Sequence, residues 1–164
     1  MRAHWAYFCE TWQHKWFVLL AGLKVGVPIW QLLIHDWVKF LPIEWGPYVH
    51  AKFEPDGTRR VLRDASGAYN PAAQSEAFQR ALHHHLREKH HPEAWVLLGR
   101  DGTLKPQPIP ERYLRETAAD WMAMARARGN KSALEYYEAE QAWVQLMMHP
   151  ESARKLGVIL WAHA

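Results

Sequence analysis

The first 23 residues carry apolar side chains at helical spacing. The residues that recur every three or four positions are Trp5, Cys9, Trp12 and Trp16, followed by Leu19 or Leu20. This spacing is typical of a helix that buries one face. It predicts a first helix over residues 3–23, with the tryptophan stripe packed in the core.

The apolar run continues from residue 16 to residue 34, which is long enough to cross a bilayer. Lys24 lies near its middle, and Gly22, Gly26 and Pro28 interrupt it. These residues favour a turn between two buried helices over a single membrane span. We therefore expect a second helix from Pro28 to Phe40 and no membrane segment.

Signals that start helices recur along the rest of the chain. They are Pro42, Asn70 followed by Pro71, Pro110, Ser132 with Glu135, and Pro150. Proline suits the first helical position, and serine with glutamate three residues later forms a capping box. The helix after Ser132 is expected to reach Met148. The sequence thus predicts one all-α domain over residues 1–164, a bundle of six or seven helices.

Two segments break the helical pattern. Turn signals at Pro55-Asp56-Gly57 and at Ser66-Gly67 predict a surface loop over residues 54–70. Arg100-Asp101-Gly102 lies between short apolar pieces and predicts a small hairpin-like excursion over residues 95–108.

Composition narrows the function classes. The net charge is +3 and the pI is about 9.1, without a lysine or arginine run of the kind that marks a nucleic-acid-binding tail. The lone Cys9 excludes an internal disulfide and favours a cytoplasmic protein. The 11 histidines are unusual for 164 residues and could supply metal ligands or proton carriers.

A His-Asp pair interrupts the apolar stretch QLLIHDWVKF at residues 31–40. Buried polar groups need partners, so His35 and Asp36 indicate a binding site. His14 lies about ten residues before the turn near Lys24, and His35 about eleven after it. At about 1.5 Å rise per residue, antiparallel helices bring the two histidines to nearly the same level. Asp120 adds a carboxylate in an apolar setting of the Pro110 helix.

The order His14, His35-Asp36 and Asp120 resembles the HD-domain superfamily of metal-dependent phosphohydrolases. The chain also resembles an uncharacterised family of small phage and bacterial proteins. The motifs that carry this second resemblance are HDWVKF (35–40), EWGPY (44–48), HHHLREKHHPEAW (83–95) and RETAADW (115–121). The resemblance covers most of residues 10–150 and implies an HD-like helical fold.

The resemblance implies a set of site residues. The metal ligands would be His14, His35, Asp36 and Asp120, with His84 and His90 or His91 as candidates for a second ion. His84 and His91 lie about 10 Å apart along a continuous helix, so sharing one ion requires a break near residues 88–89. Catalytic roles fall to Asp36 and Lys39, and the candidate substrate contacts are Lys39, Glu44, Tyr48, Arg87, His90 and Arg115.

Some positions depart from the family patterns. Val38 replaces a usual serine or threonine, Glu88 a common asparagine, and Pro92 an aromatic residue. Lys39 stands where the nucleotidase branch of the superfamily has a glutamate that acts on the attacking water. The pattern HDxxK instead resembles the branch that holds two metals, which includes cyclic-dinucleotide phosphodiesterases and di-iron oxygenases.

The leading interpretation is a metal-dependent phosphohydrolase that acts on a nucleotide or another small phosphate ester. Imidazole and carboxylate ligands suit one or two ions of Mn, Fe, Zn, Co or Ni. A di-iron oxygenase and a non-catalytic, metal-containing binding protein are the alternatives. We expect no stable binding to nucleic acid or membrane. The oligomeric state is left open, and a homodimer is one of the forms considered.

Overall fold

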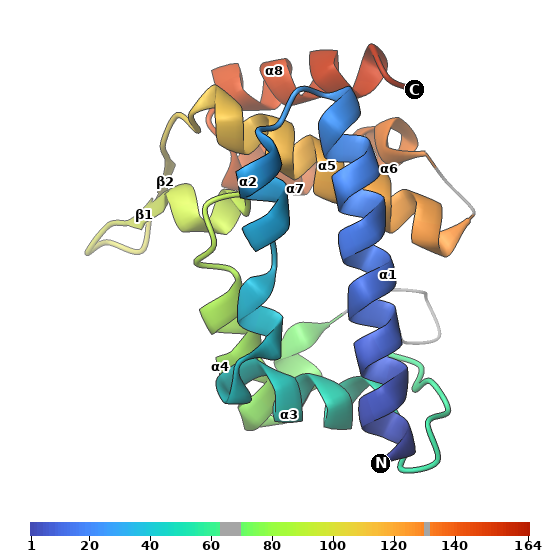
Figure 1. Cartoon of the computed structure of the whole chain (residues 1–164). Helices are drawn as coiled ribbons and strands as arrows, with labels where there is room; N and C mark the ends of the chain where they lie inside the picture. The colour runs from blue at the N-terminus through green and yellow to red at the C-terminus, as the bar shows by residue number, and fades with distance from the viewer. Residues whose placement is uncertain (63–69, 130–131) are drawn as a thin grey trace. The chain divides into compact units, whose positions relative to one another are not determined.

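A computed structural model describes residues 1–62, 70–129 and 132–164 (Figure 1). These residues form two compact units, residues 1–13 with 36–85 and residues 14–35 with 86–164. The α-helices of the described residues are α1 (Arg2–Lys24), α2 (Ile29–Ile34), α3 (Pro42–Lys52), α4 (Glu76–His85), α5 (Glu111–Arg128), α6 (Ala133–Ala139), α7 (Gln141–Met147) and α8 (Pro150–Trp161). Three short 3-10 helices and one hairpin complete the described fold.

The first unit is built from the start of α1, from α3 and from α4. Its core contains Ala3, Tyr7, Tyr48, Val49, Phe53, Phe78 and Ala81. The rings of Tyr48 and Phe78 meet edge to face with centroids 5.1 Å apart. Phe78 is fully buried in this core, and Leu82 packs against it.

Glu10 anchors the first turns of α1 to the end of α3. Its carboxylate accepts a hydrogen bond from Lys52 at 2.7 Å and another from Arg59. Burial raises the pKa of the Glu10 carboxyl, but the charges of Lys52 and Arg59 lower it more, so the pKa lies below its ordinary value. The ionised form therefore stabilises the fold.

Replacing Glu10 with glutamine should lower the free energy of unfolding at pH 7 by about 1 kcal/mol, because exposed and half-exposed ion pairs contribute little more. The difference from wild type should persist above about pH 4.3, the carboxyl pKa of the unfolded chain, and vanish as the pH falls through the lowered folded pKa. Denaturant unfolding from pH 7 to pH 3 measures it. Glu76→Gln, at an exposed pair with Arg80, is the control and should change stability little.

The second unit has α5 at its centre. α5 packs against α8 and α6, and the shared core contains Ile109, Leu114, Ala118, Ala133, Val144, Met148, Leu156 and Leu160. Strands β1 (Val96–Leu98) and β2 (Leu104–Pro106) pair antiparallel with Leu97 opposite Lys105. This hairpin confirms the excursion predicted over residues 95–108.

The turn between α1 and α2 forms as the glycines predict. Gly26 has a positive φ of 77°, Val27 donates to the Gly22 carbonyl at 2.8 Å, and Gly26 donates to the Leu23 carbonyl at 3.4 Å. These two bonds form a Schellman motif, which needs a left-handed residue at the position of Gly26. The chain then starts α2 directly after Pro28.

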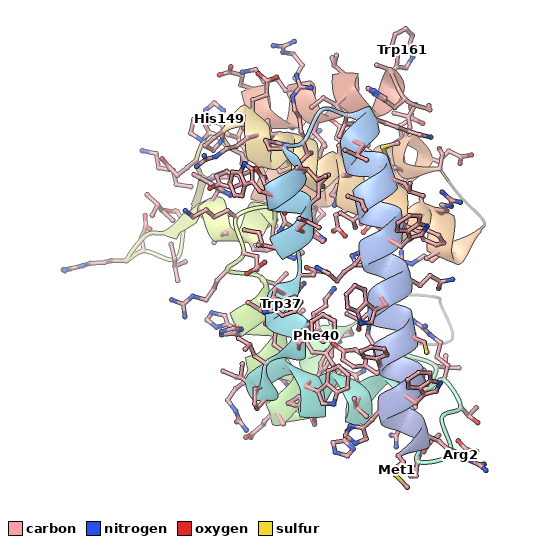
Figure 2. The ribbon with its side chains drawn as sticks, viewed as in Figure 1. Met1, Arg2, Trp37, Phe40, His149 and Trp161 are labelled. Atoms are coloured by element: carbon pink, nitrogen blue, oxygen red, sulfur yellow. The ribbon has the colours of Figure 1, made fainter. Side chains whose placement is uncertain are left out.

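The tryptophan stripe of α1 is exposed, so the prediction that it is buried was wrong. Trp5 is 68% exposed and Trp16 57%, and Cys9 and Trp12 are also exposed. The opposite face, with Val18 and Ala21, packs against Leu32, Ala119 and Ala123. In the first unit, the ring of Trp12 lies 5.9 Å from that of Phe40 between centroids. The ring of Trp37 also packs on Phe40, at a centroid distance of 5.2 Å (Figure 2).

The predicted second helix, Pro28 to Phe40, is broken at the His-Asp pair. α2 ends at Ile34, His35 is extended, and Asp36 has a positive φ of 55°. Asp and Asn adopt this left-handed conformation more readily than other non-glycine residues. A separate 3-10 helix then covers Trp37–Phe40. His35 and Asp36 therefore leave the helix end in different directions instead of sharing one helix surface.

The remaining local predictions have mixed outcomes. The Ser132–Glu135 capping box forms, and Asn70 caps the helical turn that starts at Pro71. The helix expected from Ser132 to Met148 is broken at Glu140 into α6 and α7, which raises the count above seven in the described chain. Gly57 forms its turn with φ of 93°, whereas Ser66-Gly67 lies outside the described residues. None of the described helices is long and apolar enough to cross a membrane.

Candidate metal centre

Three elements of the second unit carry a buried group of histidines and carboxylates. α1 contributes His14, the end of α2 contributes His35, and α5 contributes Asp120. Lys15, the neighbour of His14, donates to the backbone carbonyl groups of Leu33 and His35, and so satisfies the end of α2. These hydrogen bonds from Lys15 fix the position along α1 at which the backbone of His35 lies.

His14 and His35 approach the same oxygen of Asp120. The Nε2 atom of His14 lies 3.0 Å from Asp120 Oδ1, and the Nε2 atom of His35 lies 3.8 Å from it. The two imidazole rings are 5.7 Å apart between centroids. The equal levels that counting residues predicted for the two histidines thus hold in the folded chain.

These spacings fit a bound metal ion. Two ligand atoms on one tetrahedral ion, each about 2.1 Å from it, lie about 3.4 Å apart. The two nitrogen–oxygen distances, 3.0 and 3.8 Å, lie on either side of that value. All three donor atoms lie within 4.8 Å of one another. Two neutral imidazoles and a carboxylate suit Zn, Fe, Mn, Co or Ni, and three protein ligands leave a coordination position open.

A second carboxylate of α5, Glu116, contacts the other side of His35. Glu116 Oε1 lies 2.9 Å from His35 Nδ1, and Glu116 Oε2 accepts a hydrogen bond from Gln31 Nε2. The ring of His90 packs 4.4 Å from that of His35, with its Nδ1 atom 3.7 Å from Glu116 Oε1. His35 therefore lies between two carboxylates, one for each ring nitrogen.

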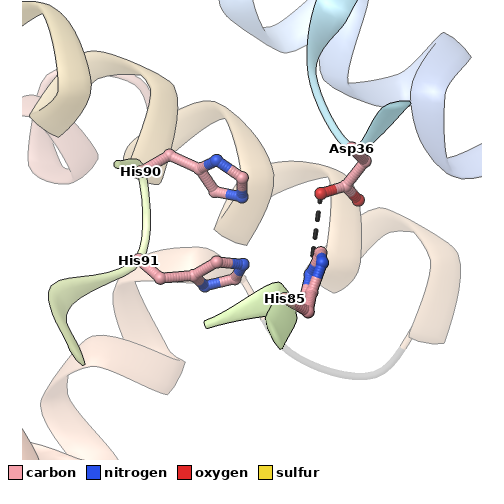
Figure 3. A group of neighbouring side chains, drawn as sticks. All are labelled: Asp36, His85, His90 and His91. Carbon is pink, nitrogen blue, oxygen red and sulfur yellow. Dashed lines mark ion pairs between the residues drawn. The ribbon is translucent and has the colours of Figure 1, made fainter. Parts of the chain in front are cut away.

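Asp36 lies in the first unit, unlike the other three predicted ligands. Within that unit its Oδ1 atom is 3.6 Å from His85 Nε2 (Figure 3). Its Oδ2 atom pairs with Lys39. His90 and His91, also drawn in Figure 3, belong to the second unit. The assignment of Asp36 as a fourth ligand stays a prediction.

Glu44 is fully buried in the first unit and contacts two histidines of α4. Its Oε1 atom is 2.6 Å from His84 Nδ1, and its Oε2 atom is 3.3 Å from His85 Nδ1. Tyr48, one helical turn further along α3, packs its ring 6.1 Å from His85. The predicted residues Glu44, Tyr48 and His84 therefore lie together around His85.

The remaining predicted residues are less closely grouped. Arg87 is exposed. Arg115 donates to the Val25 carbonyl at 2.7 Å and pairs with Glu111, so it tethers α5 to the α1–α2 turn. His91 is the residue directly before a 3-10 helix, and its ring packs on that of His90. Because α4 ends at His85, His84 and His91 do not share a helix.

Sequence reasoning missed two residues of these groups, Glu116 and His85. Glu116 is four residues before Asp120, so the two share a face of α5, and RETAADW contains both. His85 follows Phe78 by seven residues and Ala81 by four, so helical spacing places it on the inward face of α4. Extending the periodicity into the histidine cluster would have favoured His85 over His84.

Comparison with known proteins places the chain in a family without assigning a function. No curated protein and no solved structure matches it. A model of DUF5662, described as a family of unknown function, matches residues 3–161. That span contains all but the terminal residues of the two units and every residue of the groups described above. The chain therefore belongs to the family DUF5662.

Proposed function

We propose that this protein is a metal-dependent phosphohydrolase whose ion is held by His14, His35 and Asp120. The observation that carries the proposal is the approach of two imidazole nitrogens to one carboxylate oxygen, at 3.0 and 3.8 Å. An ordinary buried ion pair needs one histidine at the carboxylate. A second histidine nitrogen at ligand spacing from the same oxygen favours a cation.

Each residue has a definite part in holding the ion. Asp120 supplies the negative charge, and its side chain is 13% exposed. His14 and His35 each offer a neutral nitrogen, so the ion keeps a net positive charge. When bound, such an ion lowers the pKa of a coordinated water toward neutrality and polarises a phosphoryl oxygen.

The choice of reaction rests on the resemblance to HD-domain phosphohydrolases. His14, His35, Asp36 and Asp120 match the order of that superfamily's ligands, and HDxxK favours its two-metal branch. A nucleotide or related phosphate ester is accordingly the proposed substrate class. Lys39, predicted as a substrate contact, pairs with Asp36 in the first unit.

The test combines metal loading with a substrate panel. The purified protein is stripped with a chelator, reloaded separately with Mn²⁺, Zn²⁺ or Fe²⁺, and assayed for phosphate release from mononucleotides and cyclic nucleotides. We expect release with at least one metal, loss of release on chelation, and loss in His35→Ala.

Other outcomes would contradict the hydrolase. Two irons per chain with dioxygen-dependent turnover and no phosphate release would replace it with a di-iron oxygenase. If the metal content is the same in wild type and in His35→Ala, both the phosphohydrolase and the oxygenase are excluded. The remaining interpretation is then a non-catalytic binding protein. Metal analysis of each variant accompanies the assays, so that these outcomes are distinguished.

A further inference from the structure

We propose that Glu116 is a positioning residue: it holds His35 in the tautomer that aims Nε2 at the metal site. This inference rests on the proposed metal site but concerns a residue outside its ligand set. A metal-bound histidine usually donates a hydrogen bond from the N–H of its other ring nitrogen to a carboxylate or carbonyl. This bond fixes the orientation of the ring and strengthens the metal-binding nitrogen as a ligand. Glu116 and His35 have this arrangement.

The hydrogen bonds of Glu116 determine the proton position on His35. A carboxylate only accepts, so at 2.9 Å the Nδ1 atom of His35 is the donor and carries the hydrogen. The neutral ring then has its lone pair on Nε2, the atom that faces Asp120. The His35 ring is fully buried, so water does not compete for either nitrogen.

Gln31 fixes the other oxygen of Glu116. The Nε2 atom of Gln31 donates to Glu116 Oε2 and, at 3.3 Å, to the backbone carbonyl of Arg112. A backbone carbonyl only accepts, so this second contact sets which end of the Gln31 amide is the nitrogen. Both oxygens of Glu116 are therefore engaged by donors, and its orientation toward His35 is fixed.

The alternative role for Glu116 is that of a direct metal ligand, together with His35 and His90. Those three residues also place donor atoms within 4.8 Å of one another. Such a site would use His35 Nδ1, however, and a neutral imidazole has one lone pair. Binding there would break the 2.9 Å hydrogen bond and withdraw His35 from His14 and Asp120. We therefore assign Glu116 as the hydrogen-bond acceptor of His35 Nδ1 and not as a metal ligand.

The first experiment measures metal affinity. Zn²⁺ titration calorimetry should show that Glu116→Gln and Glu116→Ala still bind one ion, with a Kd about 10- to 100-fold weaker than wild type. Glu111→Gln is the matched control, since Glu111 lies on the same helix and is exposed. It should bind as wild type does. Thermal melting verifies that each variant is folded, and Gln31→Ala serves as a milder second variant with a smaller loss.

The second experiment needs no metal. In the metal-free protein, ¹⁵N chemical shifts of the His35 ring should show Nδ1 protonated and Nε2 bare. Glu116→Ala should give a mixture of tautomers, because the acceptor that selects Nδ1–H is gone. A structural role that only supports packing would leave this tautomer unchanged.

The two experiments separate failure of the inference from failure of the proposed function. Equal Zn²⁺ affinity in wild type and Glu116→Ala, with the His35 tautomer unchanged, would overturn the inference. Complete loss of binding in Glu116→Gln, equal to that in Asp120→Ala, would also overturn it and make Glu116 a ligand. If wild type binds no metal, the proposed function fails, while the tautomer measurement still decides the role of Glu116.

Discussion

Replacing Asp120 with alanine should weaken metal binding by at least about 100-fold, which corresponds to about 2.7 kcal/mol. Both histidine contacts that define the site converge on one oxygen of this residue. Removing it takes away the only carboxylate among the three ligands and leaves the cation's charge without its nearest counter-charge. Calorimetric titration of the chelated protein with Zn²⁺ and Mn²⁺ measures the effect.

A matched control and a second ligand variant sharpen this prediction. Asp101→Ala removes an exposed aspartate from the hairpin of the same unit, where it accepts from Thr103, and should leave affinity unchanged. His14→Ala should weaken binding on the scale of Asp120→Ala. If both ligand variants bind as wild type does, His14 and Asp120 form an ordinary ion pair, and the metal site is wrong.

Replacing Gly22 with valine should destabilise the protein by about 2 kcal/mol. A Cβ atom at this position would lie 2.2 Å from Leu32 Cδ2 and 3.1 Å from its Cγ atom. Leu32 is buried against Val18 and Ala119, so its side chain has little space into which to move. Overpacking of this kind costs about 1–3 kcal/mol and outweighs the roughly 0.5 kcal/mol of helix propensity gained by removing glycine. Denaturant unfolding measures the loss.

The same substitution should also weaken Zn²⁺ binding, because Gly22 sets the approach of the helices that carry His14 and His35. The double variant Gly22→Val with Leu32→Ala should lose less stability than the sum of the two single variants, since the smaller side chain makes room for the valine. Gly46→Ala in α3 is the control for Zn²⁺ binding: apart from its chain neighbours, its Cβ would meet nothing within 4 Å, and the affinity should be unchanged. Because Pro47 follows and disfavours a helical alanine, no stabilisation is expected from this control. Strict additivity in the double variant would contradict the proposed close packing.

Local sequence signals predicted the ends of elements well. The capping box at Ser132, the left-handed Gly26 and the hairpin over residues 95–108 depend on residues within a few positions of one another. Their geometry is therefore encoded locally. Counting along two helices from one turn likewise placed His14 and His35 at one level, because rise per residue is constant.

The inward face of α1 could not be predicted in this way. Both faces of that helix are apolar, with tryptophans on one side and Tyr7, Val18 and Ala21 on the other. Periodicity gives the spacing of a face but does not say which face other elements cover. Packing selected the side with smaller residues, which let α5 and α2 approach closely.

What the sequence by itself determined is the helical character of the chain, most helix ends, and three residues of the candidate site, His14, His35 and Asp120. Only the tertiary structure decided that the helix breaks after Ile34, and that Glu116 stands behind His35. The physical reason is that caps, turns and helical rise depend on neighbouring residues. The partners of a buried ring nitrogen come instead from segments about 80 residues apart and are fixed by packing.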